Sequence, residues 1–398
     1  MKLHAGALFW NHTKEEITIS HPEAADFYDV LIVGGGMSGA LSAYTLTKEN
    51  LKIAVVDKGT ASGGSTLANT GLLQFSNDIM LHKLIEQIGE EKAVRFYRLC
   101  SEAIDGIEKA ADELEISCDF IRRKSFYFAS EESDVELVQK EYQTLIKHGF
   151  KAEYWDQKKI ESRLPFSKPA ALITFDDAEV NPYQFSRGMI QHLVKKGVDI
   201  FENVSAEEII ETKDGIELTT SKGIFNSASL IYATGYQAPP LIKNKNRDLN
   251  RSYAIATEPV NDLSNWRDRM LIWETKRPYL YLRTTADSRI IAGGLDEDKA
   301  EMPYNDDWIM DRARHLKSEI SLLFPMLDIK IDYAWGAMFG ESNDNLPLIG
   351  RHPDKENIYY LLGYGGNGTV YSMLGSRILR DLILNRETLD ADITRLDR

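Results

Sequence analysis

Three glycines follow directly after a short apolar run near the start of the sequence. Residues 30–33 read Val-Leu-Ile-Val, and Gly34, Gly36 and Gly39 then fall at the spacing G-x-G-x-x-G. In a strand–turn–helix unit, the first glycine allows the tight turn, the second lets the backbone approach a pyrophosphate, and the third lets the helix pack on the strand. A helix expected from residue 40 would point its first N–H groups at the phosphates.

A second apolar run ends at Asp57, eighteen residues after Gly39. A carboxylate at this distance accepts hydrogen bonds from the adenosine ribose hydroxyls and repels a 2′-phosphate. The sequence therefore predicts a site for an adenine dinucleotide and disfavours NADP. The expected contacts come from Gly34, Gly36, Met37, Ser38, Gly39, Asp57 and Lys58.

Composition narrows the class of protein. The 398 residues are 43% hydrophobic, which is enough for one or two buried cores, and the net charge is −14. This acidity argues against nucleic acid and anionic membranes as partners. The sequence has two cysteines, no long apolar stretch and no secretion-signal pattern at its N-terminus. We therefore expect a cytoplasmic enzyme that does not span a membrane.

The elements that must position the motif can be followed along the chain. Helical periodicity runs from residue 81 to about 115, with breaks expected near Gly89 and Gly106. Asn181-Pro182 marks a helix start, and the sequence after Gly197 has hairpin signals at 214–215 and 222–223. Alternating segments at 254–257, 279–283 and 289–293 predict neighbouring antiparallel strands, and a strand at 358–362 enters a glycine loop and a helix at 369–384.

These patterns predict an α/β fold in which a Rossmann-like nucleotide-binding domain carries an inserted, antiparallel-sheet (α+β) substrate domain. Residues 1–28 would be an N-terminal extension and 387–398 a C-terminal tail. The nucleotide-binding domain would comprise 29–80, 150–240 and 330–386, and the substrate domain 81–149 and 241–329.

Several further motifs recur in the order found in one enzyme family. They are the 64–66 Gly-Ser-Thr loop, Ala-Thr-Gly at 233–235, Tyr-x-Arg at 281–283, Asn-Leu-Pro-Leu-Ile-Gly at 345–350 and the glycine loop at 363–368. With them, residues 27–386 resemble the D-amino-acid-oxidase-like (DAO) superfamily of FAD-dependent oxidoreductases, which includes glycine oxidase and monomeric sarcosine oxidase. Strings at 281–289, 330–335 and 357–364 are most similar to the γ-glutamylputrescine oxidoreductase branch.

The resemblance implies FAD as cofactor, with its diphosphate at the first glycine motif and its ribose at Asp57. It places the backbone of Ala206 near the adenine, and the N-terminus of the last long helix near the flavin, where its positive end would favour reduced flavin. The further residues implied to contact the cofactor are Ser65, Thr66, Asn69, Gly71, Gly235, Gly365, Gly366, Asn367, Gly368 and Thr369.

The sequence departs from the family pattern at four places. Ala68 stands where the close branch has an arginine, and Asn367 replaces the histidine of the C-terminal loop. Residues 336–340 lack the cysteine to which sarcosine oxidase attaches its flavin, so we expect non-covalent FAD. Ile291 occupies the position of an oxygen-activating lysine, which does not favour fast reaction with oxygen.

The family chemistry is oxidation of a C–N bond, in which a neutral amine gives a hydride to flavin N5 and the imine is then hydrolysed. The expected substrate is a small amine or amino acid, and oxygen or another acceptor would take the electrons. Arg283 is the candidate anchor for a substrate carboxylate, since glycine oxidase has an arginine at the matching position, and the alternative is a surface or domain-bridging arginine. Tyr279 and Tyr281 would line the amine pocket or pack the sheet, and Trp335 would be pocket wall or core.

Other polar features predict no further site. The eight histidines show no metal-ligand spacing, so we expect no metal, and the acidic run at 296–301 lacks the calcium-loop pattern, so we expect it to be solvated. Three alternative functions stay open: a 2-hydroxy-acid or glycerol-phosphate dehydrogenase, a non-catalytic flavin-binding subunit, and an NAD-only dehydrogenase. The first is disfavoured because residues 63–76 and 363–370 contain no histidine to act as base. The last would leave the C-terminal glycine loop unexplained.

Overall fold

The structure is a computed structural model that describes residues 2–13, 19, 22–237, 247–299, 301–302, 305–363 and 365–398. Its helices are α1 (Met37–Leu46), α2 (Leu81–Ile88), α3 (Glu90–Asp112), α4 (Val135–Lys147), α5 (Gln157–Glu161), α6 (Pro182–Lys195), α7 (Asp306–Leu323), α8 (Gly368–Ile383) and α9 (Ala391–Thr394). Short 3-10 helices include η1 (Phe9–Thr13) and η3 (Ser65–Ala68).

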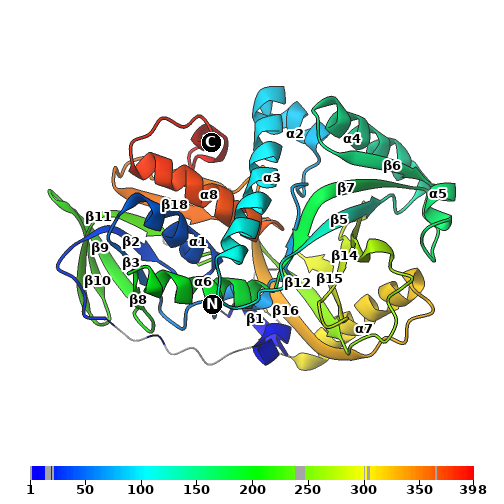
Figure 1. Cartoon of the computed structure of the whole chain (residues 1–398), viewed down its shortest axis with the longest axis horizontal. Coiled ribbons are helices and arrows are strands. Elements are labelled where there is room, and N and C mark those ends of the chain that lie inside the picture. Colours follow the sequence, from blue (N-terminus) through cyan, green and yellow to red (C-terminus); the bar gives the residue numbers. More distant parts are fainter. Residues whose placement is uncertain are drawn as a thin grey trace.

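The described strands form two sheets, which lie side by side in Figure 1. The first sheet has the order β17-β18-β11-β2-β3-β8, with β10 pairing to β11 and β9 to β10. Its strands are β2 (Tyr28–Val33), β3 (Ile53–Val56), β8 (Asp199–Phe201), β9 (Ala206–Thr212), β10 (Gly215–Thr220), β11 (Gly223–Tyr232), β17 (Leu348–Arg351) and β18 (Ile358–Leu362).

The second sheet has the order β1-β16-β12-β15-β14-β13-β5-β7-β4, with β6 on β7. Its strands are β1 (His4–Gly6), β4 (Leu72–Leu73), β5 (Ile121–Phe128), β6 (Ala152–Asp156), β7 (Ala170–Glu179), β12 (Arg247–Thr257), β13 (Leu271–Glu274), β14 (Leu280–Thr284), β15 (Ile290–Glu297) and β16 (Ile331–Ser342).

The centre of the first sheet is parallel because β18, β11, β2, β3 and β8 all pair in parallel. Both faces of this sheet are buried, which explains why the sequence at 30–33 is apolar without a break. Val30 and Ile32 pack with the core that includes α1 and α8, whereas Leu31 and Val33 pack with residues of the β9–β11 hairpins.

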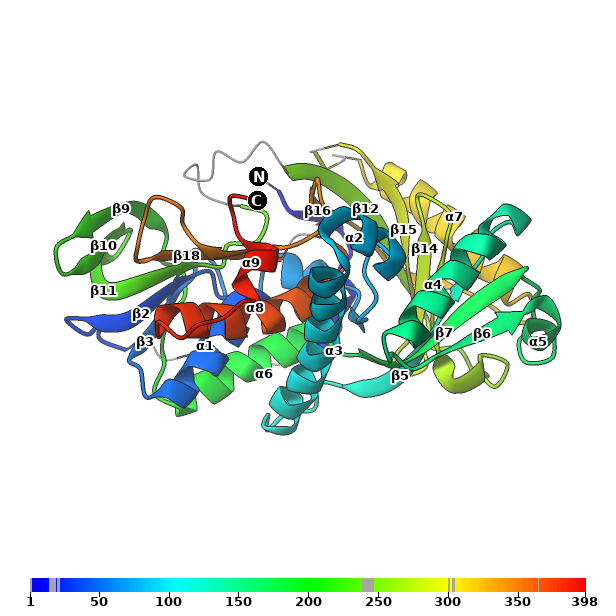
Figure 2. The same ribbon diagram turned by 90° about the horizontal axis from the view of Figure 1, so that it is seen from above.

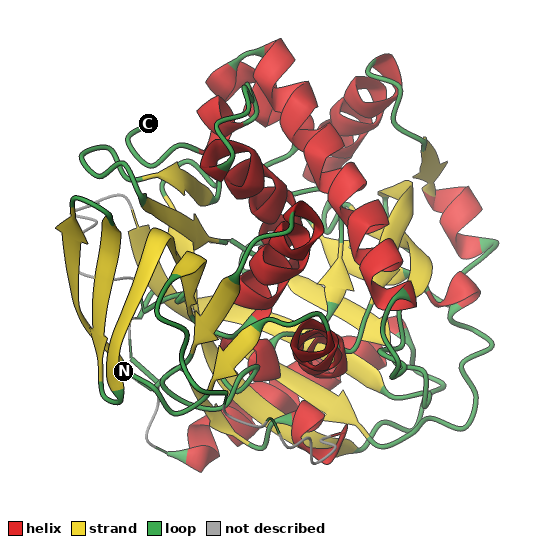
Figure 3. Ribbon diagram, turned by 60° about the vertical axis from the view of Figure 1, so that its left-hand side comes forward, coloured by secondary structure: helices red, strands yellow, loops and turns green. Residues whose placement is uncertain are grey.

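The second sheet has helices on both faces, α4 on one and α7 on the other (Figure 2). Alternate side chains of β7 divide between the two cores, since Leu172 packs on the α3 side and Ile173 on the α7 side. In Figure 3 the strands gather on the left and in the lower half, and most helices lie at the top and centre, so the molecule combines sheets and helices as expected for the α/β class with an α+β part.

Several local predictions are confirmed. The Asn181 side chain accepts a hydrogen bond from the backbone N–H of Gln184 at 3.1 Å, and Pro182 opens α6. The helix ends before Gly197, which has φ 84°. Both predicted hairpins are present, and β12, β15 and β14 are the expected antiparallel neighbours.

Other predictions need correction. The first helix begins at Met37 rather than at residue 40, so its first turn includes part of the glycine motif. Helix α3 continues through Gly106, where a Cβ would lie 2.1 Å from Nη2 of Arg377, so this glycine provides room for α8 and does not break the helix.

The sheets do not follow the predicted domain ranges at four strands. β4, β6, β7 and β16 fall in ranges predicted for the nucleotide-binding domain, yet they pair within the second sheet. Periodicity identifies a strand but does not reveal its partner, so it does not predict to which sheet these strands belong.

Candidate functional site

A large cavity lies between the two sheets and is lined by residues of both. Its volume is about 870 Å³, and its walls come from β2, α1, η3, β9, β12, β14, β15, β16 and the start of α8. This volume lies in the upper part of the range for cofactor and ligand pockets. The glycine motif and the C-terminal glycine loop both line this cavity, although they are far apart in the sequence.

The glycine motif forms the first part of this cavity. Gly34 has φ 108°, and a Cβ there would lie 2.4 Å from the carbonyl oxygen of Ala233. A Cβ at Gly39 would lie 1.8 Å from the carbonyl oxygen of Gly34, so α1 could not pack on β2 with a larger residue. Gly34, Gly36, Met37 and Ser38 line the cavity, whereas Gly39 acts behind it through this packing.

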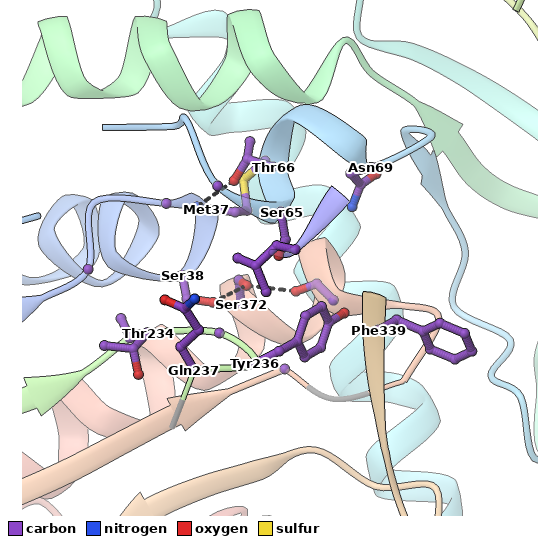
Figure 4. A pocket seen from close by; sticks show the side chains of 18 of the residues that line it. Met37, Ser38, Ser65, Thr66, Asn69, Thr234, Tyr236, Gln237, Phe339 and Ser372 are labelled. Carbon is purple, nitrogen blue, oxygen red and sulfur yellow. Dashed lines mark hydrogen bonds between the residues drawn. The ribbon is translucent and has the colours of Figure 1, made fainter. Parts of the chain in front are cut away.

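The N-terminus of α1 is tied to the walls around it (Figure 4). The backbone N–H of Met37 donates to Oγ1 of Thr66 at 3.2 Å, and the hydroxyls of Ser38 and Ser372 are 2.8 Å apart. The second pair joins α1 directly to α8. A helix N-terminus held open to a cavity in this way suits a phosphate group.

Asp57 lies at the end of β3, as the sequence predicts, and lines the cavity together with Lys58. Its Oδ2 accepts a hydrogen bond from Gly35 N at 2.7 Å, and its Oδ1 accepts one from Gly59 N at 2.8 Å. The carboxylate therefore fixes the glycine turn as well as facing the cavity. The backbone N–H of Val204 donates to the carbonyl of Asp57 at 2.8 Å, which places the wall formed by 204–209, including Ala206, beside it.

The loop at 65–71 and the C-terminal glycine loop meet in the wall of the cavity, where Nδ2 of Asn69 lies 3.4 Å from Oγ1 of Thr369. Ser65, Thr66 and Asn69 line it from one side, with Gly235 and residues 365–369 among the other lining residues. Asn367 donates through Nδ2 to the carbonyl oxygens of Gln74 at 2.7 Å and Ser76 at 2.9 Å, so α8 begins against the 74–78 segment. Gly71 does not line the cavity; a Cβ there would lie 2.2 Å from the carbonyl oxygen of Val180.

Tyr279 and Tyr281 line the cavity where β14 approaches it, and their ring centroids are 5.7 Å apart. A Cβ at Gly293 would lie 2.2 Å from the Tyr281 hydroxyl, so this ring lies across β15 at a position that requires glycine. Burial raises the pKa of both phenols, so they are neutral at physiological pH.

Two carboxylates, Asp78 and Asp296, line this same part of the cavity, and neither was predicted as a site residue. Asp78 accepts hydrogen bonds from Gly366 N at 2.8 Å and from the Tyr279 hydroxyl at 3.4 Å. Burial raises the pKa of Asp296 to about 6, and the neighbouring charge of Asp78 adds to the shift. The pKa of Glu341 nearby is raised to about 7, by burial and then by these two carboxylates.

The expectation that the 296–301 run is solvated is therefore wrong for Asp296. Leu295 has φ 59°, and the register of β12 against β15 shifts between Arg251 and Tyr253. Such an irregularity redirects side chains and breaks simple alternation. Asp78 was missed because it follows the polar residues 76–77, just beyond the loop identified in the sequence.

The structure does not bring Arg283 or Trp335 to the cavity wall. Arg283 is 2% exposed and donates through Nε to the carbonyl of Thr70 at 2.6 Å, and through its Nη atoms to the carbonyls of Val180 and Thr284. Burial lowers the pKa of this guanidinium, opposed by the Glu179 carboxylate, whose Oε2 lies 3.8 Å from Nη1.

Trp335 is 1% exposed, and its Nε1–H donates to the carbonyl of Ala68 at 3.0 Å. In both cases the contacts match the alternative given with the prediction, a bridging arginine and a core tryptophan, because the donors of each residue are directed at backbone carbonyls of the loop at 65–71 or beside it.

The residues present fit FAD. The cavity offers a glycine cradle at Gly36, a helix N-terminus and Asp57 at one part, and a second helix N-terminus with aromatic walls at the other. Among the described residues, no cysteine or histidine lines the cavity, and no group of three or more His, Cys, Asp or Glu side chains could hold a metal ion. No helix in the described ranges is long and apolar enough to cross a membrane.

Comparison with known proteins agrees with this geometry. The family model "DAO: FAD dependent oxidoreductase" matches residues 29–382. A probable oxidoreductase OrdL of Haemophilus influenzae is 23% identical over 96% of this chain and 88% of its own length, and γ-glutamylputrescine oxidoreductase of Escherichia coli is 24% identical over 90% and 83%.

Among solved structures, glycine oxidase from Geobacillus kaustophilus has the same fold, with a TM-score of 0.80, 19% identity and coverage of 94% of this chain and 99% of that chain. The resemblance seen in the motifs is thereby confirmed. The chain belongs to the DAO family of FAD-dependent oxidoreductases.

Proposed function

We propose that this enzyme oxidises a C–N bond of a small amine that carries a positively charged group in addition to the reacting nitrogen. The observation that carries the proposal is the pair of carboxylates, Asp78 and Asp296, on the cavity wall beside Tyr279 and Tyr281. Of the described residues that line the cavity, Lys58 is the one lysine or arginine, and it lies next to Asp57 in the sequence. A wall of this kind favours a cation over a free carboxylate.

The names of the relatives support an amine as the reacting group. One relative is named γ-glutamylputrescine oxidoreductase and one structural neighbour is a glycine oxidase. In both named compounds, a carbon that bears an amine nitrogen also carries hydrogen. The acidic wall narrows this class toward diamines and related cations.

In this proposal FAD is held without a covalent bond, since the described cavity wall offers no cysteine or histidine for attachment. Asp57, Ala206 and the start of α1 would hold its adenosine and diphosphate, and the residues near α8 and β14 would hold its flavin. When bound, FAD supplies the acceptor for a hydride from the carbon that bears the amine, and the resulting imine is released to water.

The residues of the chain bind and orient the substrate. Asp296 and Asp78 hold the charged group, and their attraction is strong because both lie in a partly buried wall. Tyr279 and Tyr281 provide flat walls that hold the reacting carbon in place and exclude water. The N-terminus of α8, at Gly368 and Thr369, presents positive partial charge to the cavity, which favours added negative charge on a cofactor there.

The electron acceptor in the proposal is oxygen or another small or protein acceptor. Ile291, which the resemblance places where relatives carry an oxygen-activating lysine, is fully buried and packs with Trp335. We expect slow reoxidation by oxygen for this reason.

Turnover with an artificial dye as acceptor tests the proposal. The purified holoenzyme would be given putrescine, butylamine, glycine and lactate, and the products identified by mass spectrometry. We expect putrescine to be converted to its amino-aldehyde far faster than butylamine or glycine. Turnover of glycine without putrescine would contradict the cationic substrate but not amine oxidation, whereas turnover of lactate alone would contradict both.

A further inference from the structure

Residues 2–13 lie outside the range matched by the family model, yet one of them, Leu3, lines the cavity. In Figure 1 this dark-blue segment lies beside β16. β1 pairs antiparallel with β16, with His4 opposite Ala337 and Gly6 opposite Trp335. The carbonyl of Leu3 accepts a hydrogen bond from Met338 N at 2.8 Å, and Leu3 itself lines the cavity.

The 3-10 helix η1 that follows is anchored by its aromatic side chains. Phe9 is 1% exposed and Trp10 is 2% exposed. Both belong to a cluster of buried residues that also includes Leu67 and Ala68 of η3 and Trp335 of β16. The segment is therefore part of the packing behind the loop at 65–71.

Trp10 makes one specific polar contact within this cluster. Its Nε1–H donates to the backbone carbonyl of Asn69 at 2.6 Å. The side chain of Asn69 accepts from Gly71 N at 2.7 Å and lies 3.4 Å from Oγ1 of Thr369, in the first turn of α8. Trp10 thus fixes the backbone of a residue that lines the cavity and reaches the helix N-terminus.

The neighbouring carbonyls are held in the same way. Those of Ala68, Asn69 and Thr70 accept in turn from Trp335 Nε1, Trp10 Nε1 and Arg283 Nε. We call these three donors the carbonyl clamp. The Arg283 guanidinium carbon also lies 5.4 Å from the centre of the Trp10 ring, so two members of the clamp contact each other. None of the three donors lines the cavity, so the three carbonyls are directed away from it.

We propose that the N-terminal segment, through Trp10, is a positioning element of the FAD site. Trp10 completes the carbonyl clamp and so fixes the cavity-facing side of residues 65–71 against α8. This role rests on FAD binding in the cavity and not on the identity of the amine. Trp10 does not touch the reacting atoms and is a positioning residue.

The test compares two matched variants, Trp10→Phe and Trp266→Phe. Each removes one indole N–H bond to a backbone carbonyl from a tryptophan that is 2% exposed, since Trp266 Nε1 donates to the carbonyl of Met270 at 2.8 Å. Trp266 belongs to the core around α7 and does not line the cavity. Apo-protein of each variant would be titrated with FAD, following flavin fluorescence, and the visible circular dichroism of the bound flavin recorded.

We expect Trp10→Phe to weaken FAD binding about tenfold and to change the dichroism of the flavin, because an unpaired carbonyl loosens the loop. Trp266→Phe should leave both unchanged, even where the two variants lose similar thermal stability. An unchanged FAD dissociation constant in folded Trp10→Phe, or an equal change in Trp266→Phe, would overturn the proposal.

A measurement on the unaltered protein covers the case in which Trp10→Phe does not fold. Hydrogen–deuterium exchange would be compared with and without FAD. We expect FAD to slow exchange in peptides covering 8–13 as well as 65–71. Protection of 65–71 without any change at 8–13 would overturn the proposal. No amine is used in either experiment, so failure of the proposed substrate class cannot be mistaken for failure here.

Discussion

Replacement of Asp296 by Asn removes one charge from the substrate part of the cavity and keeps the shape of the side chain. Asp296 lies on β15 among Tyr281, Ser252 and Asp78, all of which line the cavity. The proposal assigns it to the second, charged group of the amine. The variant should therefore lose affinity for diamines and not for monoamines of the same length.

The expected size follows from the electrostatics of a partly buried pair. Two opposite charges about 4 Å apart attract by about 4 kcal/mol at an effective dielectric constant of about 20. Asp78 remains in the variant, so we expect about half of this to be lost. A loss of about 2 kcal/mol corresponds to a decrease of about 30-fold in kcat/KM for putrescine relative to butylamine.

The pH dependence provides a second readout. Burial and the charge of Asp78 raise the pKa of Asp296 to about 6, so this carboxylate is neutral below that pH and ionised above it. The ratio of kcat/KM for putrescine to that for butylamine should therefore rise as the pH increases through about 6. Taking the ratio removes the effect of pH on the ionisation of the reacting amine, which both substrates share. In Asp296→Asn we expect the ratio to rise much less with pH. A carboxyl whose pKa is higher in the folded protein than in the unfolded chain destabilises the fold once it is ionised, here above about pH 6. Asp296→Asn removes this charge, so at pH 7 we expect the variant to melt at no lower a temperature than the parent protein.

Asp298→Asn is the matched control, since Asp298 is exposed, lies two residues away and does not line the cavity. We expect its substrate ratio to equal that of the parent. The reasoning would be refuted if Asp296→Asn left the ratio unchanged, or if Asp298→Asn lowered it as much.

Three further predictions follow from the same structure. Gly39→Ala should abolish FAD binding or folding, because its Cβ would lie 1.8 Å from the Gly34 carbonyl oxygen. The control Gly59→Ala, whose Cβ would have its nearest contact at 3.8 Å, should bind FAD normally in a fluorescence titration. Arg283→Met should lower the free energy of unfolding by about 3 kcal/mol in denaturant titrations, because it leaves the buried carbonyls of Thr70 and Val180 without their donor and removes one of the two guanidinium groups beside Glu179. A selective loss of activity on carboxylate substrates at unchanged stability would contradict this reasoning. Denaturation in acid should release all flavin into the supernatant, and flavin retained on the precipitated protein would reveal a covalent bond.

The parts of this site that depend on local sequence could be predicted. The glycine spacing, the cap at Asn181 and the position of Asp57 each depend on a few adjacent residues, and the structure places them as expected. Residue type and spacing suffice there because the backbone geometry itself demands glycine, a capping side chain or a strand end.

The roles of Arg283 and Trp335 could not be predicted in the same way. Their partners, the carbonyls of Thr70 and Ala68, are more than two hundred residues away in the sequence and carry no signature in their side chains. An arginine that alternates with tyrosines on a strand has the same pattern whether it faces a ligand or a backbone loop. Asp296 was missed for a related reason, since the left-handed conformation of Leu295 has no signal in a leucine.

The most direct test of the central claim is an anaerobic titration of the purified holoenzyme with amines, following the visible absorption band of oxidised flavin. We predict complete bleaching by a diamine, at one amine oxidised per FAD, and much slower bleaching by glycine or lactate at equal concentration. A flavin that is bleached by lactate and by no amine would contradict the account.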